Sequence, residues 1–268
     1  MKAYLYHIKA ITNLQVCSGE ENFGVVDNLI QRDAATGIPA INASSLKGAI
    51  REAFEQNKAS GVDVNKLFGS KPSEQDKQSA GSLRFFDAHL LAMPVRTNKV
   101  PYLMATSPML VRDYIAKCKL LKLPITFDEA KINAILSEAK ELHPLVSDEK
   151  YKDINVEDLD NKTVYSKTLS ELGEMLGIDS ATLVLFHDDD FLKLCDDNHL
   201  PIIARNCLEK GHENLWYEQV LPRFTQMYFF VLADDELSAF TKALSDKLLQ
   251  IGANASVGYG FCQIMQVK

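Results

Sequence analysis

The chain has 268 residues, of which 46% are hydrophobic and 24% are charged, a composition typical of globular proteins that excludes intrinsic disorder as its main description. Its 29 Lys and Arg stand against 36 Asp and Glu, and the resulting net charge of −7 excludes a simple basic nucleic-acid-binding protein. The charge is uneven, because residues 1–125 carry 16 basic and 11 acidic side chains (net +5), whereas residues 126–200 carry 7 and 18 (net −11). We expect these two stretches to face different partners.

The sequence predicts a protein that stays out of membranes and oxidising compartments. No apolar run reaches the roughly 18–20 residues that a bilayer-spanning helix needs, and the first residues lack the pattern of a secretory signal. The five cysteines are scattered and contain no Cys-x-x-Cys pair, which argues against a disulfide scaffold or a zinc ribbon. We therefore expect a cytoplasmic protein with reduced thiols and no membrane partner.

The helix after the first long loop is the best-defined element of the first half. Leu46, Ile50 and Phe54 recur at the spacing of one helix face, and Ser44 offers an N-cap. The polar stretch over 17–43 is long for a loop, which is typical of functional or mobile segments. The other elements expected in this half are strands over 2–16 and 82–93 and a helix over 106–119.

The second half is acidic and mostly helical in pattern from about 121 to 182. After it, the pattern predicts a strand that runs into acidic turns over 181–191, a hairpin over 200–219 with Glu209-Lys210-Gly211-His212 at its tip, a strand over 223–233, a helix over 235–250 and a strand over 256–267. Without the middle segment the order is strand–helix–strand twice, the split βαβ pattern of a ferredoxin-like α+β domain. We expect a single domain over 1–268, with a core of about 1–119 and 220–268 and with a helical acidic insertion and a hairpin over about 120–219.

A glycine-rich run lies between the last predicted helix and the last predicted strand. Gly252, Gly258 and Gly260 would let backbone N–H groups approach a phosphate closely. The spacing matches neither a Walker loop nor a dinucleotide-binding fingerprint. A tight turn between a helix and a strand explains the same glycines, so the run by itself leaves both interpretations open.

The predicted helix that begins near Ser45 is a second candidate for phosphate binding. Its N-terminal N–H groups carry positive dipole charge, and Lys47 and Arg51 lie one turn apart on a neighbouring face. Such a helix end suits a phosphodiester. The alternative is an ordinary surface helix in which Arg51 pairs with Glu55 at i+4.

Asp27 is the carboxylate of greatest interest in the loop over 17–43. A lone loop carboxylate usually shapes a turn, but beside a phosphate it could orient a 2′-hydroxyl or hold a divalent cation. Trp216 and Tyr217 could offer a stacking surface for a base, or they could be core residues. The acidic runs over 187–190 and 196–199 contain metal-ligand residue types without a spacing that fixes a coordination geometry, so we expect solvated turns there and no metal site built by the protein alone.

Taken together, these stretches resemble the RAMP superfamily of CRISPR proteins. The similar runs are Gly24-Val25-Val26-Asp27, Gln31-Arg32-Asp33, Thr36-Gly37-Ile38-Pro39, the run over 44–51 and the glycine-rich run over 251–261. The run Asn214-Leu215-Trp216-Tyr217-Glu218, followed by Leu221-Pro222, is similar to the repeated backbone subunit of type III-B Cmr effector complexes. The similarity covers roughly residues 11–54, 183–222 and 251–262.

The resemblance implies a modified RNA-recognition fold whose copies stack head-to-tail along a guide CRISPR RNA, together with the other Cmr complex subunits. It also implies that a thumb hairpin from each copy interrupts the guide–target duplex, and that single-stranded target RNA is cut beside each thumb. Asp27 falls on the aspartate required for cutting, with Tyr217 and Glu218 near the cut. The residues implied to bind RNA are Ser45, Lys47, Arg51, Trp216, Gly252, Gly258 and Gly260.

The implied chemistry is endoribonucleolytic cleavage that leaves a 2′,3′-cyclic phosphate, with Mg²⁺ or another divalent cation bound only together with RNA. Gln15 stands where this superfamily often has a histidine, so histidine chemistry is in doubt at that position. The alternative is a non-catalytic structural RNA-binding backbone subunit, with Asp27 only a turn residue. A guide-processing endonuclease of the same superfamily is less well supported, because it tends to use histidine in the first half, where this chain has only His7 and His89.

Overall fold

The computed structural model of the chain describes residues 1–19, 24–56, 62–70, 79–125, 127–159, 161–209, 212–234, 237–245 and 247–267. Its internal contacts divide the chain into two compact units. One unit consists of Met1–His89 with Leu200–Lys268, and the other consists of Leu90–His199. Both units combine helices with strands, so the protein is α+β as expected.

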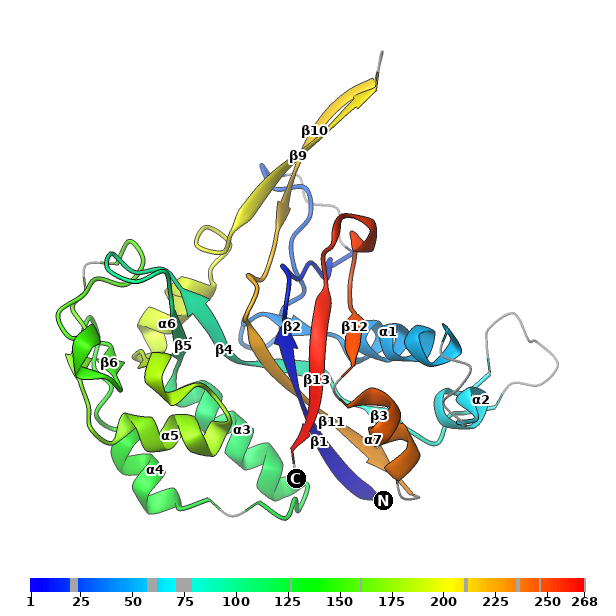
Figure 1. Cartoon of the computed structure of the whole chain (residues 1–268), viewed down its shortest axis with the longest axis horizontal. Helices are drawn as coiled ribbons and strands as arrows, with labels where there is room; N and C mark the ends of the chain where they lie inside the picture. Colours follow the sequence, from blue (N-terminus) through cyan, green and yellow to red (C-terminus); the bar gives the residue numbers. More distant parts are fainter. Residues whose placement is uncertain are drawn as a thin grey trace. The chain divides into compact units, whose positions relative to one another are not determined.

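The first unit is built on an antiparallel sheet with β1 inside it (Figure 1). β1 pairs with β11 on one side and with β13 on the other, and β12 pairs with the far side of β13. The elements of this unit are β1 (Lys2–Ala10), β2 (Ala40–Ile41), α1 (Ala43–Gln56), α2 (Val64–Phe68), β3 (Arg84–Phe85), the start of β4 (Ala88–Val95), β9 (Ile202–Glu209), β10 (His212–Gln219), β11 (Gln226–Ala233), α7 (Ser238–Leu244), β12 (Leu248–Gln250), the 3-10 turn η5 (Ala255–Val257) and β13 (Phe261–Val267).

Aromatic rings join the helices of this unit to its sheet. Tyr6 of β1 stacks on Phe229 of β11, with ring centroids 5.2 Å apart. Phe240 of α7 lies 6.2 Å from the Tyr6 ring and 5.1 Å from the ring of Phe54 in α1. The predicted apolar stripe of α1 is confirmed, because Leu46, Ile50 and Phe54 are its buried residues. Each such side chain removed from water contributes about 1.5–3 kcal/mol, which fixes α1 on the sheet.

The predicted hairpin is confirmed as the antiparallel pair β9 and β10, in register from Ile202 opposite Gln219 to Glu209 opposite His212. Figure 1 shows it extending away from the sheet of the first unit. The other two residues expected at its tip, 210–211, lie outside the described part of the chain. Leu215, halfway along β10, is 58% exposed, so this hairpin is not a core element along its whole length.

Four expectations for the first unit were wrong in detail. Ser44 is not the N-cap of α1, because the helix already begins at Ala43. The first strand ends at Ala10 and does not continue to residue 16. The strand expected over 82–93 is interrupted at residues 86–87, and the Asp87 carboxylate there accepts a hydrogen bond of 2.6 Å from the Ala43 N–H at the start of α1. The helix expected over 235–250 ends at Leu244, because Leu248–Gln250 pair with β13 as β12. Strand pairing outweighs the helical periodicity of this short segment.

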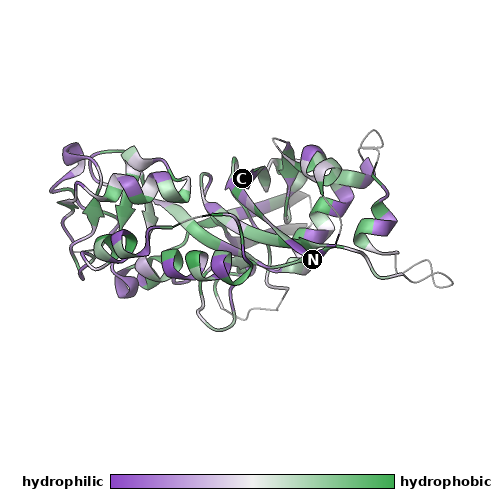
Figure 2. Cartoon of the chain, turned by 90° about the horizontal axis from the view of Figure 1, so that it is seen from below, coloured by the Kyte–Doolittle hydropathy of each residue, from purple (hydrophilic) through white to green (hydrophobic). Residues whose placement is uncertain are grey.

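The second unit is a small mixed sheet, in the order β4-β5-β8-β6-β7, and its described residues also form four helices. Its elements are the rest of β4, β5 (Leu103–Thr106), α3 (Pro108–Leu120), α4 (Glu129–Leu136), β6 (Leu145–Val146), the 3-10 turn η3 (Glu149–Tyr151), β7 (Val164–Tyr165), α5 (Leu169–Leu176), the 3-10 turn η4 (Ser180–Thr182), β8 (Leu183–Leu185) and α6 (Asp188–Cys195). The helix expected over 106–119 is confirmed as α3. The mostly helical pattern expected over 121–182 was only partly correct, because β6 and β7 interrupt it. Figure 2 shows hydrophobic and hydrophilic residues alternating along the helices, as amphipathic packing requires.

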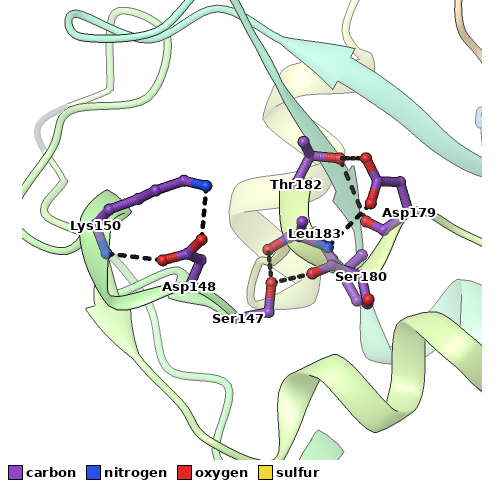
Figure 3. Close-up of polar contacts among 8 residues, drawn as sticks. Ser147, Asp148, Lys150, Asp179, Ser180, Thr182 and Leu183 are labelled. Atoms are coloured by element: carbon purple, nitrogen blue, oxygen red, sulfur yellow. Dashed lines mark hydrogen bonds and ion pairs between the residues drawn. The ribbon is translucent and has the colours of Figure 1, made fainter.

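Short polar contacts hold the turn before β8 in place (Figure 3). Asp179 accepts hydrogen bonds from the Ala181 N–H at 3.1 Å and from the Thr182 hydroxyl at 3.3 Å. The Ser147 hydroxyl donates to the carbonyl oxygens of Ser180 and Leu183. These contacts cap η4 and fix the entry into β8. None of the described helices in either unit is long and apolar enough to cross a membrane.

The acidic run after β8 is a helix start, where the sequence led us to expect solvated turns. Asp188, Asp189 and Asp190 form the first turn of α6, where carboxylates favour the positive end of the helix dipole. Asp190 is only 2% exposed, and it accepts hydrogen bonds from the Leu142 N–H at 2.7 Å and from Lys193 at 3.0 Å. The later run over 196–199 is an exposed turn, as expected.

Candidate nucleic-acid interface

Asp27 lies at the base of the hairpin. The carboxylate oxygen Oδ2 of Asp27 accepts a hydrogen bond of 2.8 Å from the Tyr217 N–H. The Tyr217 carbonyl oxygen in turn accepts from the N–H groups of Asp27 at 3.0 Å and Asn28 at 3.2 Å. The Gln219 N–H donates to the Asn28 carbonyl at 2.9 Å. These bonds attach the first loop to the end of β10 and leave the exposed Asp27 side chain facing solvent.

Glu218, beside this contact, is a buried carboxylate with several hydrogen-bond donors around it. It is 4% exposed. Trp216 Nε1 donates to its Oε1 at 2.8 Å, and Asn254 Nδ2 donates to its Oε2 at 2.9 Å. Arg205 of β9 forms an ion pair with the same Oε2 at 3.4 Å. Both oxygens of Glu218 are therefore engaged inside the protein, whereas Asp27 is exposed and its bond to the Tyr217 N–H involves Oδ2.

The glycine-rich segment between β12 and β13 packs against the start of the first loop, which in the structure follows directly after β1. The Ala253 N–H donates to the Gln15 carbonyl at 2.9 Å, and the Gly260 N–H donates to the Asn13 carbonyl at 2.8 Å. Gly252 has φ +87°, and a Cβ there would lie 2.3 Å from the Gln15 oxygen. Only glycine fits such a close approach at positive φ. Gly258 differs from Gly252, because nothing lies within 4 Å of a Cβ placed on it.

A polar chain connects this loop contact to the start of α1. Gln15 Nε2 donates to Cys17 Sγ at 2.9 Å, and Gln31 Nε2 donates to the Cys17 carbonyl at 3.0 Å. Gln31 Nε2 also donates to the Ser45 hydroxyl at 3.0 Å. Ser45 at the start of α1 is thus held against the first loop through Gln31.

Lys47 and Arg51 differ in their surroundings. Lys47 is half-exposed on α1. The Arg51 guanidinium donates to Glu55, to the Gly69 carbonyl and to Asn65, each at 2.9 Å. The Arg51–Glu55 pair expected for an ordinary surface helix is present, and Arg51 also joins α1 to the α2 segment.

Aromatic rings and a cation cover Glu218. The Arg205 guanidinium carbon lies 5.9 Å from the Trp216 ring centre and 5.5 Å from that of Tyr259, within the range of cation–π contacts. Trp216 is half-buried, so part of its flat ring forms a surface here, while the charge of Arg205 beside it is paired with the buried Glu218. Successive bases of single-stranded RNA bind to such surfaces by stacking.

Sequence reasoning missed Arg205, Asn254 and Tyr259. Asn254 has φ +64°, which asparagine tolerates better than most residues. An asparagine inside a glycine-rich turn is the one signal that could have pointed to it. Nothing local marks Arg205, because its partners lie on other segments.

One group of possible metal ligands lies among the described residues, in the second unit. Ligand atoms of Glu141, His187 and Asp189 lie within 4.8 Å of one another. The two carboxylates are exposed, and exposed acidic groups are common without a metal. No other contact in this unit points to a ligand there, so we assign it no site.

The comparison with protein families agrees with this arrangement. A model of the RAMP superfamily matches residues 7–263, a range that includes the first loop, α1, the hairpin and the glycine-rich segment. The chain therefore belongs to the RAMP superfamily.

Individual relatives narrow the comparison. The chain is 30% identical over 288 residues to the CRISPR system Cmr endoribonuclease Cmr4 of Pyrococcus furiosus, covering 98% of this chain and 95% of that protein. Its fold is similar to that of a chain in the structure of a type III-B Cmr-beta complex bound to cognate target RNA (TM-score 0.76, 21% identity, 99% of this chain and 97% of that one). It is also similar to oligomeric Cmr4 from Pyrococcus furiosus (TM-score 0.71, 24% identity, 100% and 98%).

Proposed function

We propose that this chain is the repeated backbone subunit of a type III-B CRISPR effector complex, which binds guide RNA and cleaves the paired target RNA at regular intervals. The observation that carries the proposal is the exposed Asp27 carboxylate, held by the Tyr217 N–H at the base of a projecting hairpin. The relative from Pyrococcus furiosus is named an endoribonuclease, and one solved structure of Cmr4 from that organism is described as oligomeric. The partners are guide CRISPR RNA, single-stranded target RNA, copies of this chain head-to-tail and the other Cmr subunits.

The core of this subunit is ferredoxin-like, with the modifications of an RNA-recognition fold. Support comes from the order β1, α1, β4 followed by β11, α7, β13, with β1 between β13 and β11. The His89 ring at the start of β4 lies 5.7 Å from the Tyr228 ring of β11. We retain the proposal of a single RAMP domain over 1–268 in which about 120–219 elaborates the core. The cytoplasmic location stays a prediction.

The proposed reaction is attack of a target 2′-hydroxyl on the adjacent phosphorus. The new 2′-O–P bond forms as the P–O5′ bond breaks, and the leaving O5′ takes a proton from water, which gives a 2′,3′-cyclic phosphate and a 5′-hydroxyl. The Oδ1 atom of Asp27 orients the 2′-hydroxyl and takes its proton, while Oδ2 is held by Tyr217. Because attack must be in line, the hairpin contributes by displacing the target nucleotides next to Asp27. Tyr217 and Glu218 flank this position.

A divalent cation such as Mg²⁺ fits Asp27 only together with RNA. Mg²⁺ keeps several waters and binds proteins through one or two carboxylates plus substrate phosphates. Asp27 offers one exposed carboxylate, and the neighbouring Glu218 has both oxygens engaged. When bound, the cation would neutralise charge that develops on the phosphate.

RNA binding by each copy is weak and becomes strong through repetition. The candidate contacts are Ser45 and Lys47 on α1, the turn at Gly252, Gly258 and Gly260, and the Trp216 ring. Phosphate affinity depends on the local positive patch more than on the total charge, and binding sites linked along one guide reinforce each other. The contact of Arg51 with RNA stays a prediction, since its guanidinium already has three partners.

Reconstitution with guide RNA, partner subunits and end-labelled target RNA tests the function. The expected result is cuts at even spacing that disappear when EDTA removes divalent cations. Tightly bound but intact target in the presence of Mg²⁺ would instead support the structural, non-catalytic backbone. Fragments ending in a 2′,3′-cyclic phosphate resist a phosphatase that removes 3′-monophosphates, which checks the proposed chemistry.

A further inference from the structure

Glu218 connects three segments that are distant in sequence. Its carboxylate receives Trp216 of its own strand, Arg205 of the paired strand β9 and Asn254 of the glycine-rich segment. Its backbone forms a parallel bridge with Asn28, next to Asp27. The groups that hold the Glu218 side chain therefore lie beside the backbone bonds that attach the end of β10 to the first loop.

We propose that Arg205 and Asn254 are positioning residues that act through Glu218 to hold the Asp27 carboxylate in place for target cleavage. This inference rests on the proposed function. Asp27 itself touches neither residue in the described contacts, since it is held by the Tyr217 backbone. Arg205 and Asn254 fix Glu218, Glu218 fixes the chain at Tyr217, and Tyr217 fixes Asp27.

Because Glu218 is buried, we assign it the role of positioning Asp27 and not that of transferring a proton. Glu218 is 4% exposed and both its oxygens accept hydrogen bonds. A proton-transfer group must come within hydrogen-bond reach of the reacting atoms, and the exposed Asp27 carboxylate meets that need beside it. A buried carboxylate persists only where donors compensate its charge, and Arg205, Trp216 and Asn254 supply that compensation.

Two variants test separately the contacts that Asn254 and Arg205 make with Glu218. Asn254→Gly removes the amide donor and keeps the left-handed backbone, which glycine adopts freely. Arg205→Lys keeps the positive charge and loses the planar fork and its contact with the Trp216 and Tyr259 rings. Asn198→Gly, in the exposed turn after α6, is the matched control for loss of an asparagine side chain.

In assembled complex with saturating target, we expect Asn254→Gly and Arg205→Lys to slow single-turnover cleavage on the order of 10–100-fold, as small misplacement of a reacting group does. Guide affinity should fall by a smaller factor than the cleavage rate, and Asn198→Gly should cleave like wild type. In the free chain, amide hydrogen exchange at Asp27 and Asn28 should be more than tenfold faster in both variants. Cleavage by Asn254→Gly and Arg205→Lys at the wild-type rate would overturn the proposal. Unchanged hydrogen exchange at the Asp27 and Asn28 amides would also overturn it, and this can be measured even for a variant that does not assemble.

Glu218→Gln tests the assigned role directly. Glutamine keeps the shape but cannot titrate, so the pH–rate profile of the slower variant should keep the wild-type shape. Loss of one limb of the profile would make Glu218 a proton-transfer group and contradict the inference. Asp27→Asn is measured in parallel. Target cleavage at the normal rate by that variant would contradict the proposed function itself, independently of the results for the other variants.

Discussion

The Asp27 carboxylate accepts a hydrogen bond of 2.8 Å from the backbone N–H of Tyr217, a residue 190 positions further along the chain. This bond joins the first loop to the base of the hairpin and orients one oxygen of an exposed carboxylate. Because the donor is a backbone group, the contact depends on the path of the chain at Tyr217 and not on its phenol. Any change that moves the end of β10 relative to the first loop should therefore affect Asp27.

Substitution of Arg51 should mainly lower the stability of the fold, whereas substitution of Lys47 should mainly lower the affinity for guide RNA. Arg51→Gln removes contacts with Glu55, Gly69 and Asn65, so we expect the free energy of unfolding to fall by about 1–3 kcal/mol. Lys47→Gln should leave stability within about 0.5 kcal/mol, while guide affinity falls and its salt dependence weakens by about one phosphate contact. Urea unfolding and guide binding at several salt concentrations measure both effects. The opposite pattern, with Arg51→Gln weakening guide binding and leaving stability unchanged, would make Arg51 an RNA ligand.

The three glycines near the C-terminus should not be equivalent. Gly252→Ala and Gly260→Ala would place a Cβ 2.3 Å from the Gln15 oxygen and 2.1 Å from the Ile251 oxygen, both at positive φ. We expect each to lower the free energy of unfolding by about 3 kcal/mol or more, from backbone strain and overpacking together. Gly258→Ala meets nothing within 4 Å and should lose only about 1 kcal/mol, from its φ of +84°. Chemical denaturation compares the three, and equal losses would contradict the packing described for this turn.

His7 should make the protein sensitive to mild acid. Burial lowers the pKa of His7 from 6.5 to about 4, so the folded state keeps it neutral where the unfolded chain is already protonated. The unfolded state then binds more protons between pH 6.5 and 4, and stability falls as the pH drops through that window. The loss attributable to His7 approaches about 3 kcal/mol at pH 4. Unfolding of wild type and His7→Gln at pH 7, 5.5 and 4.5 measures it, and parallel pH dependences would refute the assignment.

The local periodic elements could be predicted from the sequence. The α1 stripe of Leu46, Ile50 and Phe54 and the hairpin of β9 and β10 were both correct, because spacing and turn residues act within a few positions. The predicted helix over 235–250 was wrong at its end, since Leu248–Gln250 pair with β13. A short segment with helical spacing becomes a strand when a sheet edge is available, and no local pattern reveals that edge.

The candidate site was only partly predictable for the same reason. Asp27, Trp216, Tyr217 and Glu218 were identified from motifs that resemble a family, and the structure brings them together. Arg205 and Asn254 were missed, although Asn254 lies 36 positions from Glu218 and 2.9 Å from it in space. Such partners become visible only once β9, β10 and the turn after β12 are placed.

The most direct measurement of the central claim compares Asp27→Asn with wild type in the assembled complex. Asparagine keeps the size of the side chain and an oxygen that can accept from the Tyr217 N–H, but it loses the negative charge. We expect unchanged guide binding and assembly, with the rate of target cleavage reduced on the order of 100-fold or more, as for loss of a general base. Evenly spaced cuts at the wild-type rate in the Asp27→Asn complex would contradict it.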